Sequence, residues 1–172
     1  MYRQRSNNDK MKQIEYDEKL ALEIYNEFYP HCTMKEAVYG YIAEALVEKH
    51  YGKPINDKWT GVPDKGWDYV DDNGNKIDVK NTRSSVQFMG HDSHHWIINC
   101  YHGLNADAYL CTELDTANKV ISLIGFITPD RVQVVGTFYK KDQIFPWGKR
   151  CNGDCFVVKK ADITDIPPEI TV

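Results

Sequence analysis

One segment of the chain has the pattern of a helix without a polar face. Between Ala37 and Val47, eleven residues contain a single charged side chain, that of Glu44. A helix that is apolar on all sides must be covered on all sides, so it belongs inside a layered domain. A carboxylate in such a helix costs free energy unless it meets a cation, a hydrogen-bond donor or a gap that leads to water. Glu44 is therefore either a structural residue in a polar contact or a functional one.

The order of the predicted elements indicates an α/β class, an α+β mixed sheet flanked by helices. We expect a helix over residues 11–29, ended by Pro30, and a second one that begins at a capping box of Thr33 and Glu36 and ends near Tyr51 at Gly52. Alternating or apolar runs predict strands at residues 67–70, 76–82, 96–101, 108–113, 120–127 and 155–158. A short helix capped by Thr128 and a helical turn at residues 161–166 complete the set.

Composition is that of an ordinary globular protein. The 172 residues are 42% hydrophobic and 27% charged, which is sufficient for a core without covalent staples. We expect a disordered polar tail at residues 1–10 and one domain at residues 11–172. The apolar stretches are too short to span a bilayer and the first residues lack a signal-peptide pattern, so we expect a cytoplasmic protein with no membrane partner. Without a secretory signal, the five cysteines are expected to be reduced thiols.

Charge is unevenly distributed along the chain. The formal net charge is −4, which argues against a protein that coats nucleic acid non-specifically. The segment from Lys119 to Lys160, however, has eight basic and three acidic residues and thus carries +5, leaving −9 for the rest of the chain. Such an asymmetry permits a basic face on an acidic protein.

A second unusual pattern lies in the predicted hairpin. In Ile77-Asp78-Val79-Lys80 the apolar and charged residues alternate, so Asp78 and Lys80 share one face of the strand while Ile77 and Val79 enter the core. Asp68 lies on the preceding strand. Two carboxylates and an ammonium can thus meet at one point, and carboxylate oxygens suit Mg²⁺. An acid-x-Lys pattern alone is common and more typical of a solvated strand face with an ion pair.

Taken together, Gly40-x-x-x-Glu44 in an apolar helix, Asp68 on a strand and Asp78-x-Lys80 on the next strand resemble the PD-(D/E)xK nuclease superfamily, which has a restriction-endonuclease-like fold. The resemblance covers residues 34–130. The family's proline before the first acid is replaced by Trp67. Pro63-Asp64 does contain the dipeptide, but it stands fourteen residues before Asp78 in a Gly/Pro-rich loop, so Asp68 is the better match.

The resemblance implies a metal-dependent nuclease that hydrolyses phosphodiester bonds, most often in DNA. By it, Asp68, Asp78 and the carbonyl of Val79 would bind Mg²⁺, with Mn²⁺ as a substitute, and the metal would polarise the phosphate and activate water. Lys80 would orient the nucleophile or stabilise charge in the transition state. Glu44 would bind a second metal ion or fix a water. We expect DNA as the partner, with RNA and a second copy of the chain as further candidates.

Two segments are predicted to contact nucleic acid. Thr82 and Ser84 continue the face of Asp78 and Lys80 and can donate to a phosphate, whereas Arg83 points elsewhere or turns back. The run Trp147-Gly148-Lys149-Arg150 combines an aromatic ring with Lys149 and Arg150, so it could stack on a base and contact phosphates. The alternatives are an ordinary polar strand end for the first segment and a tryptophan that caps the edge of the core for the second.

Other readings stay open at this stage. A non-catalytic module on the same fold could bind nucleic acid or protein without a metal. The Cys151-x₃-Cys155 spacing is compatible with zinc, and His91, His94, His95, Cys100 and His102 could complete a site in a small zinc-stabilised protein. Because the histidines scatter over a predicted loop and Cys100 lies in an apolar strand, we favour free thiols over a structural zinc.

Two geometric expectations test the nuclease interpretation. Glu44 should be buried and point toward Asp68 and Asp78. A two-residue Asn73-Gly74 turn would place Asp68 on the wrong face of the hairpin, because a shift of one residue exchanges the faces. The loop must therefore have an odd length or contain a bulge, with Gly74 as its left-handed residue; otherwise Asp64 or Asp71 would replace Asp68.

Overall fold

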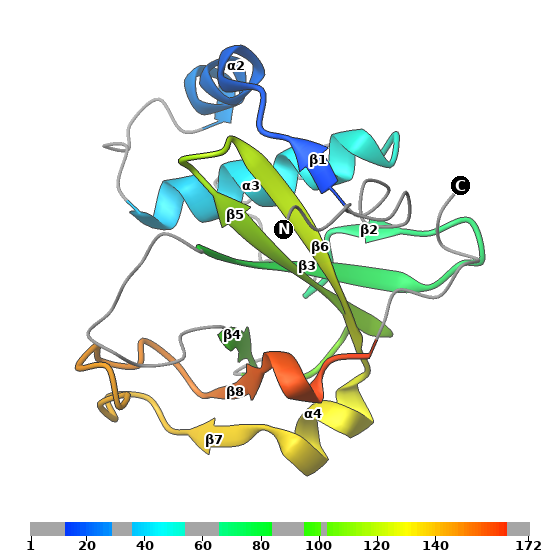
Figure 1. Cartoon of the computed structure of the whole chain (residues 1–172). Helices are drawn as coiled ribbons and strands as arrows, with labels where there is room; N and C mark the ends of the chain where they lie inside the picture. The colour runs from blue at the N-terminus through cyan, green and yellow to red at the C-terminus, as the bar shows by residue number, and fades with distance from the viewer. Residues whose placement is uncertain (1–12, 29–35, 54–65, 84–94, 101–102, 165–172) are drawn as a thin grey trace, which may run out of the picture.

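A curled mixed sheet of five strands forms the centre of the fold (Figure 1). The computed structural model of the chain describes residues 13–28, 36–53, 66–83, 95–100 and 103–164. The strand order is β1-β6-β5-β3-β2. The strands are β1 (Gln13–Glu15), β2 (Tyr69–Val70), β3 (Lys76–Arg83), β5 (Ala108–Asp115) and β6 (Val120–Ile127). β3 and β5 run parallel, and the other neighbours are antiparallel.

Helix α3 (Glu36–His50) packs against one face of this sheet. Its apolar residues share a core with Ile77 and Val79 of β3. Helix α2 (Glu18–Phe28) packs against α3 and lies next to the turn between β5 and β6, where Lys119 donates to the Glu18 carboxylate at 3.0 Å (Figure 1). Helix α3 ends as expected at Gly52, whose φ is +67°. The Gly52 amide donates to the Lys49 carbonyl and the Lys53 amide donates to the Glu48 carbonyl, both at 2.9 Å, so the end of the helix is a Schellman motif.

A second, smaller sheet lies at the other face. It has the order β4-β8-β7 and consists of β4 (His95–Asn99), β8 (Cys155–Lys159) and β7 (Thr137–Tyr139). Trp96 and Ile98 of β4 share a core with Tyr109 and Cys111 of β5. Helix α4 (Pro129–Val135) and the short 3₁₀ helix η1 (Lys160–Asp162) flank it. Within the described residues the protein is thus a mixed α/β structure with a curled mixed sheet and three α-helices (Figure 1).

The expected elements are largely confirmed, with differences at the N-terminal side. Most of the predicted strands lie within a few residues of the observed bounds, and Thr128 caps α4 by accepting from the Arg131 amide. The helix predicted over residues 11–29 is wrong at its start, because residues 13–15 form β1 and pair with β6. Asp17 begins the helix instead, since its carboxylate accepts from the Lys19 and Leu20 amides.

Some predicted features lie outside the described residues, and some observed elements were not predicted. The tail at residues 1–10, the Thr33 cap and the end of the helical turn beyond residue 164 lie outside them. The sequence did not predict β1, β7 or the division into two sheets. Across the described segments, none of the helices has the length and apolar character that crossing a membrane requires.

Candidate active site

Every charged side chain that is buried in the described part of the chain is acidic. The exposed fractions are 8% for Glu44, 1% for Glu48, 3% for Asp68 and 7% for Asp78. Glu44 and Glu48 come from α3, Asp78 comes from β3, and Asp68 directly precedes β2. Buried carboxylates require hydrogen bonds, a cation or a proton, so these four residues are the candidates for a functional site in the described part of the chain.

The hairpin between β2 and β3 brings Asp68 to the edge of β3. Tyr69 pairs with Ile77 and Val70 pairs with Lys76, so the five residues 71–75 form the loop. The loop has an odd length and Gly74 has a φ of +86°, which confirms the expected departure from a plain two-residue turn. The Asp71 carboxylate closes the loop by accepting from the Asn73 and Asn75 amides.

The Asp68 carboxylate accepts the hydrogen bond of the Val79 amide that a neighbouring strand would otherwise accept. The Asp68 amide donates to the Ile77 carbonyl at 2.8 Å, and Asp68 Oδ2 accepts from the Val79 amide at 2.7 Å. The N–H and C=O of a strand residue point to the same side, so the Val79 carbonyl also points to this edge. Two kinds of oxygen, a carboxylate and a carbonyl, are thus brought together where β2 begins.

Asp78 and Lys80 lie on the face of β3 opposite to Ile77 and Val79. Lys80 Nζ is 2.7 Å from Asp78 Oδ1, and both side chains are largely shielded from solvent. Their partners in β5 are Tyr109 and Cys111. Burial raises the pKa of the Cys111 thiol, while the Lys80 ammonium lowers it and the Asp78 carboxylate raises it further. The acid-x-Lys pair is therefore a shielded ion pair next to the core, and a fully solvated strand face is excluded.

Helix α3 contains two buried acids, and the sequence predicted only one. The burial of Glu44 is confirmed, but its direction toward Asp68 and Asp78 stays a prediction. Glu48 lies one turn later on the same face of the helix. The adjacent Tyr51 stacks on Tyr69 of β2 with ring centroids 5.9 Å apart, so this face is turned toward the hairpin. The sequence analysis did not single out Glu48, because the apolar run that drew attention to Glu44 ends at Val47. The spacing of four residues between Glu44 and Glu48 was the available signal.

The Tyr69 hydroxyl is buried without a hydrogen-bond partner among the described residues. Burial raises the pKa of Tyr69, and the charges of Asp71, Asp68 and Glu48 raise it further, as does Tyr51. Because buried polar groups normally find partners, the hydroxyl indicates a place beside the acids where a water or ligand atom would satisfy it.

The donor set fits Mg²⁺ in its chemistry. It consists of hard oxygen ligands, and Mg²⁺ needs only one or two carboxylates when water and a phosphate complete its shell. In the described segments, no group of three or more His, Cys, Asp or Glu side chains is placed to hold a metal ion. A site formed by Asp68, Asp78 and the Val79 carbonyl would have two acidic side chains, which is the number that Mg²⁺ needs when water and a phosphate supply its other ligands.

Substitutions of Asp68 should separate its hydrogen bond from its charge. Asp68→Ala removes the acceptor of the buried Val79 amide and is expected to lower the free energy of unfolding by about 1–3 kcal/mol. Asp68→Asn keeps an acceptor oxygen and removes a negative charge from an acidic region, so it should retain most of the stability. Thermal and urea unfolding of both variants measure the difference. An equal loss in both would mean that the carboxylate charge, and not the hydrogen bond, stabilises the hairpin.

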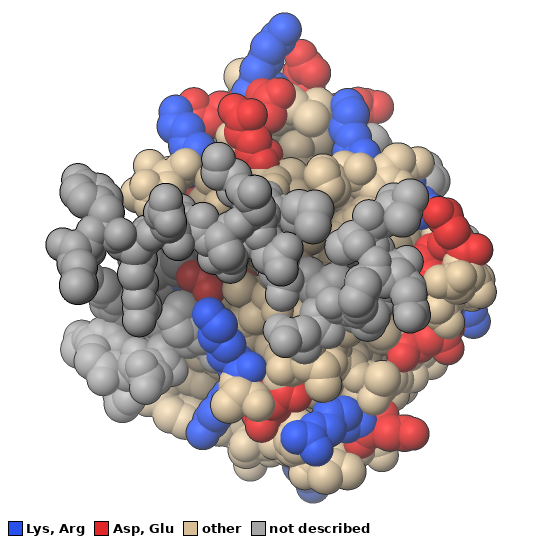
Figure 2. All heavy atoms as spheres, turned by 45° about the vertical axis from the view of Figure 1, so that its right-hand side comes forward, with Lys and Arg blue, Asp and Glu red and all other residues tan. Residues whose placement is uncertain are grey.

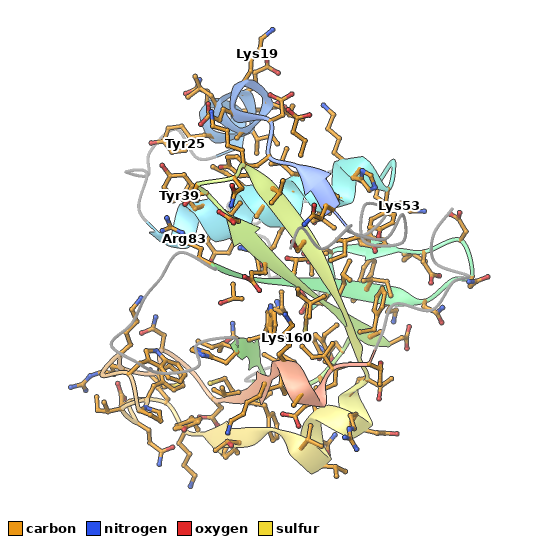
Figure 3. All side chains as sticks on the ribbon, viewed as in Figure 1. Lys19, Tyr25, Tyr39, Lys53, Arg83 and Lys160 are labelled. Atoms are coloured by element: carbon orange, nitrogen blue, oxygen red, sulfur yellow. The ribbon has the colours of Figure 1, made fainter. Side chains whose placement is uncertain are left out.

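The predicted nucleic-acid contacts at the end of β3 are partly described. Thr82 is half-buried, and Ser84 lies outside the described residues. The Arg83 guanidinium lies 5.2 Å from the centroid of the Tyr39 ring, on the α3 side of the sheet. Figure 3 shows Tyr25, Tyr39 and Arg83 together on one side of the molecule. The expectation that Arg83 turns away from the face of Asp78 and Lys80 is confirmed.

The Trp147 ring belongs to a small aromatic stack. Its centroid is 4.5 Å from that of Phe145 and 4.0 Å from that of His95. Of the two alternatives for Trp147, these contacts favour the cap on the edge of a core. Lys149 and Arg150 are exposed, and Arg150 lies 3.7 Å from the exposed carboxylate of Asp142. They stay candidates for phosphate contacts.

The described basic residues are not clustered on the face shown in Figure 2. Lys and Arg side chains alternate there with acidic ones, most clearly over α2, outside the grey segments. Association with a polyanion would therefore depend on local contacts near the site more than on a broad positive surface on this face.

Comparisons of the chain with protein-family models and with curated proteins give no match.

Proposed function

We propose that the chain is a Mg²⁺-dependent nuclease of the restriction-endonuclease-like class that hydrolyses phosphodiester bonds in DNA. The observation that carries the proposal is the hairpin: Asp68 accepts from the Val79 amide at the strand edge, directly beside the shielded Asp78–Lys80 ion pair. The burial of Glu44 in the neighbouring helix supports it.

In this proposal Asp68, Asp78 and the Val79 carbonyl would hold Mg²⁺, and Mn²⁺ would substitute for it. When bound, the metal supplies a Lewis acid for the phosphate and lowers the pKa of a coordinated water. Lys80 is held by Asp78 and presents an ammonium at the place where negative charge develops. Glu44 and Glu48 add negative charge behind the site, which favours a cation and disfavours a bare phosphate.

A binding module on the same fold is the second candidate. The observation that favours it is the ion pair itself, because an Asp78 that is neutralised by Lys80 at 2.7 Å can be a purely structural residue. Such a module would bind nucleic acid or protein without metal. Metal dependence separates the two functions.

A cleavage assay with the full chain tests the proposal. Linear, circular, single-stranded and branched DNA, and an RNA of the same sequence, are incubated with Mg²⁺, Mn²⁺ or EDTA. We expect cleavage of at least one DNA substrate with either metal and none with EDTA. Binding of DNA with no cleavage under any condition would support the module, and cleavage of RNA alone would correct the substrate.

Glu48→Gln should weaken binding of the metal more than it affects folding. The change removes one negative charge from a fully buried position near Asp68, and a loss of about 10-fold in Mn²⁺ affinity is typical for a residue that supports metal ligands. Calorimetric titration with Mn²⁺ measures it without reference to activity. Glu23→Gln, the same substitution on the exposed surface of α2, is the matched control. Equal Mn²⁺ affinities in both variants would remove Glu48 from the site.

A further inference from the structure

Two cysteines outside the candidate active site are held side by side by the backbone. Cys151 lies in the connection between β7 and β8, four residues before Cys155, which is the first residue of β8. The Cys151 amide donates to the Gln143 carbonyl and its own carbonyl accepts from the Asp142 amide, while Cys155 pairs with Asn99 and Tyr139 in the small sheet. Both residues are anchored by main-chain hydrogen bonds, so the geometry of their thiols is set by the fold.

The two thiols are in contact within a small separate core. The Sγ atoms of Cys151 and Cys155 are 3.2 Å apart, and Cys151 Sγ lies 2.7 Å from the Gly153 carbonyl. Both side chains are buried together with Phe145 and Val157, and Tyr139 and Trp147 pack against them. Lys149 and Arg150 lie in the chain between Phe145 and Cys151, two residues of this core, so the core anchors both ends of the segment that carries them.

The sulfur separation distinguishes the possible uses of the pair. Two thiolates on one tetrahedral zinc, each about 2.3 Å from the metal, would lie about 3.8 Å apart. The observed separation is shorter, and no third metal-ligating side chain is grouped with the pair in the described residues. A covalent disulfide needs about 2.05 Å, so the sulfurs must approach by little more than 1 Å.

We propose that Cys151 and Cys155 form a reversible intramolecular disulfide by exchange with a low-molecular-weight disulfide such as glutathione disulfide. The proposal is independent of the nuclease function. One protein thiol loses its proton and attacks a glutathione sulfur, which breaks that S–S bond and releases one glutathione thiolate. The second protein thiol then loses its proton and attacks the mixed disulfide, which releases the second glutathione. The two protons protonate the two glutathione thiolates, so two thiols are oxidised and one disulfide is reduced.

Burial makes the reaction slow and its product persistent. Desolvation raises the pKa of the Cys155 thiol to about 12, and its contact with Cys151 contributes to the shift. Cys155 is therefore protonated at neutral pH, and exchange requires opening of the segment that covers the pair. The same cover protects the finished disulfide from reduction. The bond would close a ring at the base of the segment carrying Trp147, Lys149 and Arg150, and thereby restrict its opening.

Mass spectrometry of the full chain tests the proposal. The reduced protein is incubated with excess glutathione disulfide, the remaining thiols are blocked, and intact mass and peptide mapping follow. We expect the loss of two hydrogen atoms, mapped to Cys151 and Cys155. Exchange of backbone amides with deuterium in residues 140–154 should become roughly tenfold slower in the oxidised form.

Three serine variants make the result specific. Cys151→Ser and Cys155→Ser should each end at a mixed disulfide with glutathione or remain reduced, whereas Cys100→Ser, which changes the nearby half-buried thiol, should oxidise as the wild type does. A disulfide that maps to Cys100 would overturn the assignment. So would a wild-type chain that stays fully reduced under conditions in which it is folded, or a zinc ion that is retained stoichiometrically and blocks oxidation.

Discussion

Asp78→Asn is expected to abolish metal-dependent cleavage and to leave the chain folded. The carboxylate is proposed as a direct ligand, and Mg²⁺ depends on carboxylate charge because it gives up its water reluctantly. Asparagine has the same shape and its oxygen can still accept from Lys80, which lies 2.7 Å from Asp78 in the native protein. The variant leaves the Lys80 ammonium without a charged partner, but the new amide oxygen still accepts its hydrogen bond, so the free energy of unfolding should fall by less than in a variant that removes the hydrogen bond as well.

Cleavage of the best DNA substrate and thermal unfolding should be measured on the same preparation. Asp72→Asn is the matched control, because Asp72 lies in the loop of the same hairpin, is exposed, and pairs only at the surface with Lys53. The control should cleave like the wild type. An Asp78→Asn variant that cleaves normally while the wild type needs Mg²⁺ would take this hairpin out of the mechanism, and one that fails to fold would make Asp78 a structural residue.

The parts of the site that the sequence predicts are those set by short-range patterns. The alternation of Ile77, Asp78, Val79 and Lys80 assigns the two faces of β3 correctly, because side chains alternate in any strand. The nuclease interpretation requires a hairpin loop of odd length or with a bulge, and the observed register agrees with this requirement. The burial of Glu44 follows from the lack of a polar face in its helix.

The parts that the sequence does not predict depend on distant contacts. β1 is three residues long and exists because Ile14 pairs with Ile121 of β6, over a hundred residues away. Glu48 is buried because the hairpin is packed beside the end of α3, which no local pattern at Lys49 and His50 indicates. The Asp68 contact with the Val79 amide depends on where β2 begins, and a propensity for strand cannot place that start to one residue.

Substitution of Lys80 is expected to lower both the rate of cleavage and the free energy of unfolding, and the two effects can be measured separately. Lys80→Met keeps the packing of the long side chain and removes the ammonium, so cleavage should fall by about 10²–10³-fold, the loss typical of one preorganised donor to a developing charge. Removal of one partner of a buried ion pair is also destabilising. From the sequence, Ile77 and Val79 are the residues of this strand that enter the core, which predicts that Asp78 and Lys80 matter little for folding; the 2.7 Å ion pair corrects this expectation.

The cost in stability should be about 3 kcal/mol, at the low end for a buried pair because the Lys80 side chain keeps 16% of its surface in water. The double variant Asp78→Asn/Lys80→Met should recover most of that loss, since neither charge is then left without its partner, and it should remain inactive. Urea unfolding of the wild type, both single variants and the double variant gives the coupling free energy, and single-turnover cleavage gives the rates. Because Asp78→Asn alone is expected to abolish cleavage, the double variant tests only the stability of the ion pair, and the single variant Lys80→Met tests the chemistry. A rate that stays about 10²–10³-fold below that of the wild type at a temperature where Lys80→Met is fully folded assigns Lys80 to the chemistry. A wild-type rate under those conditions would mean that Lys80 acts only by stabilising the fold.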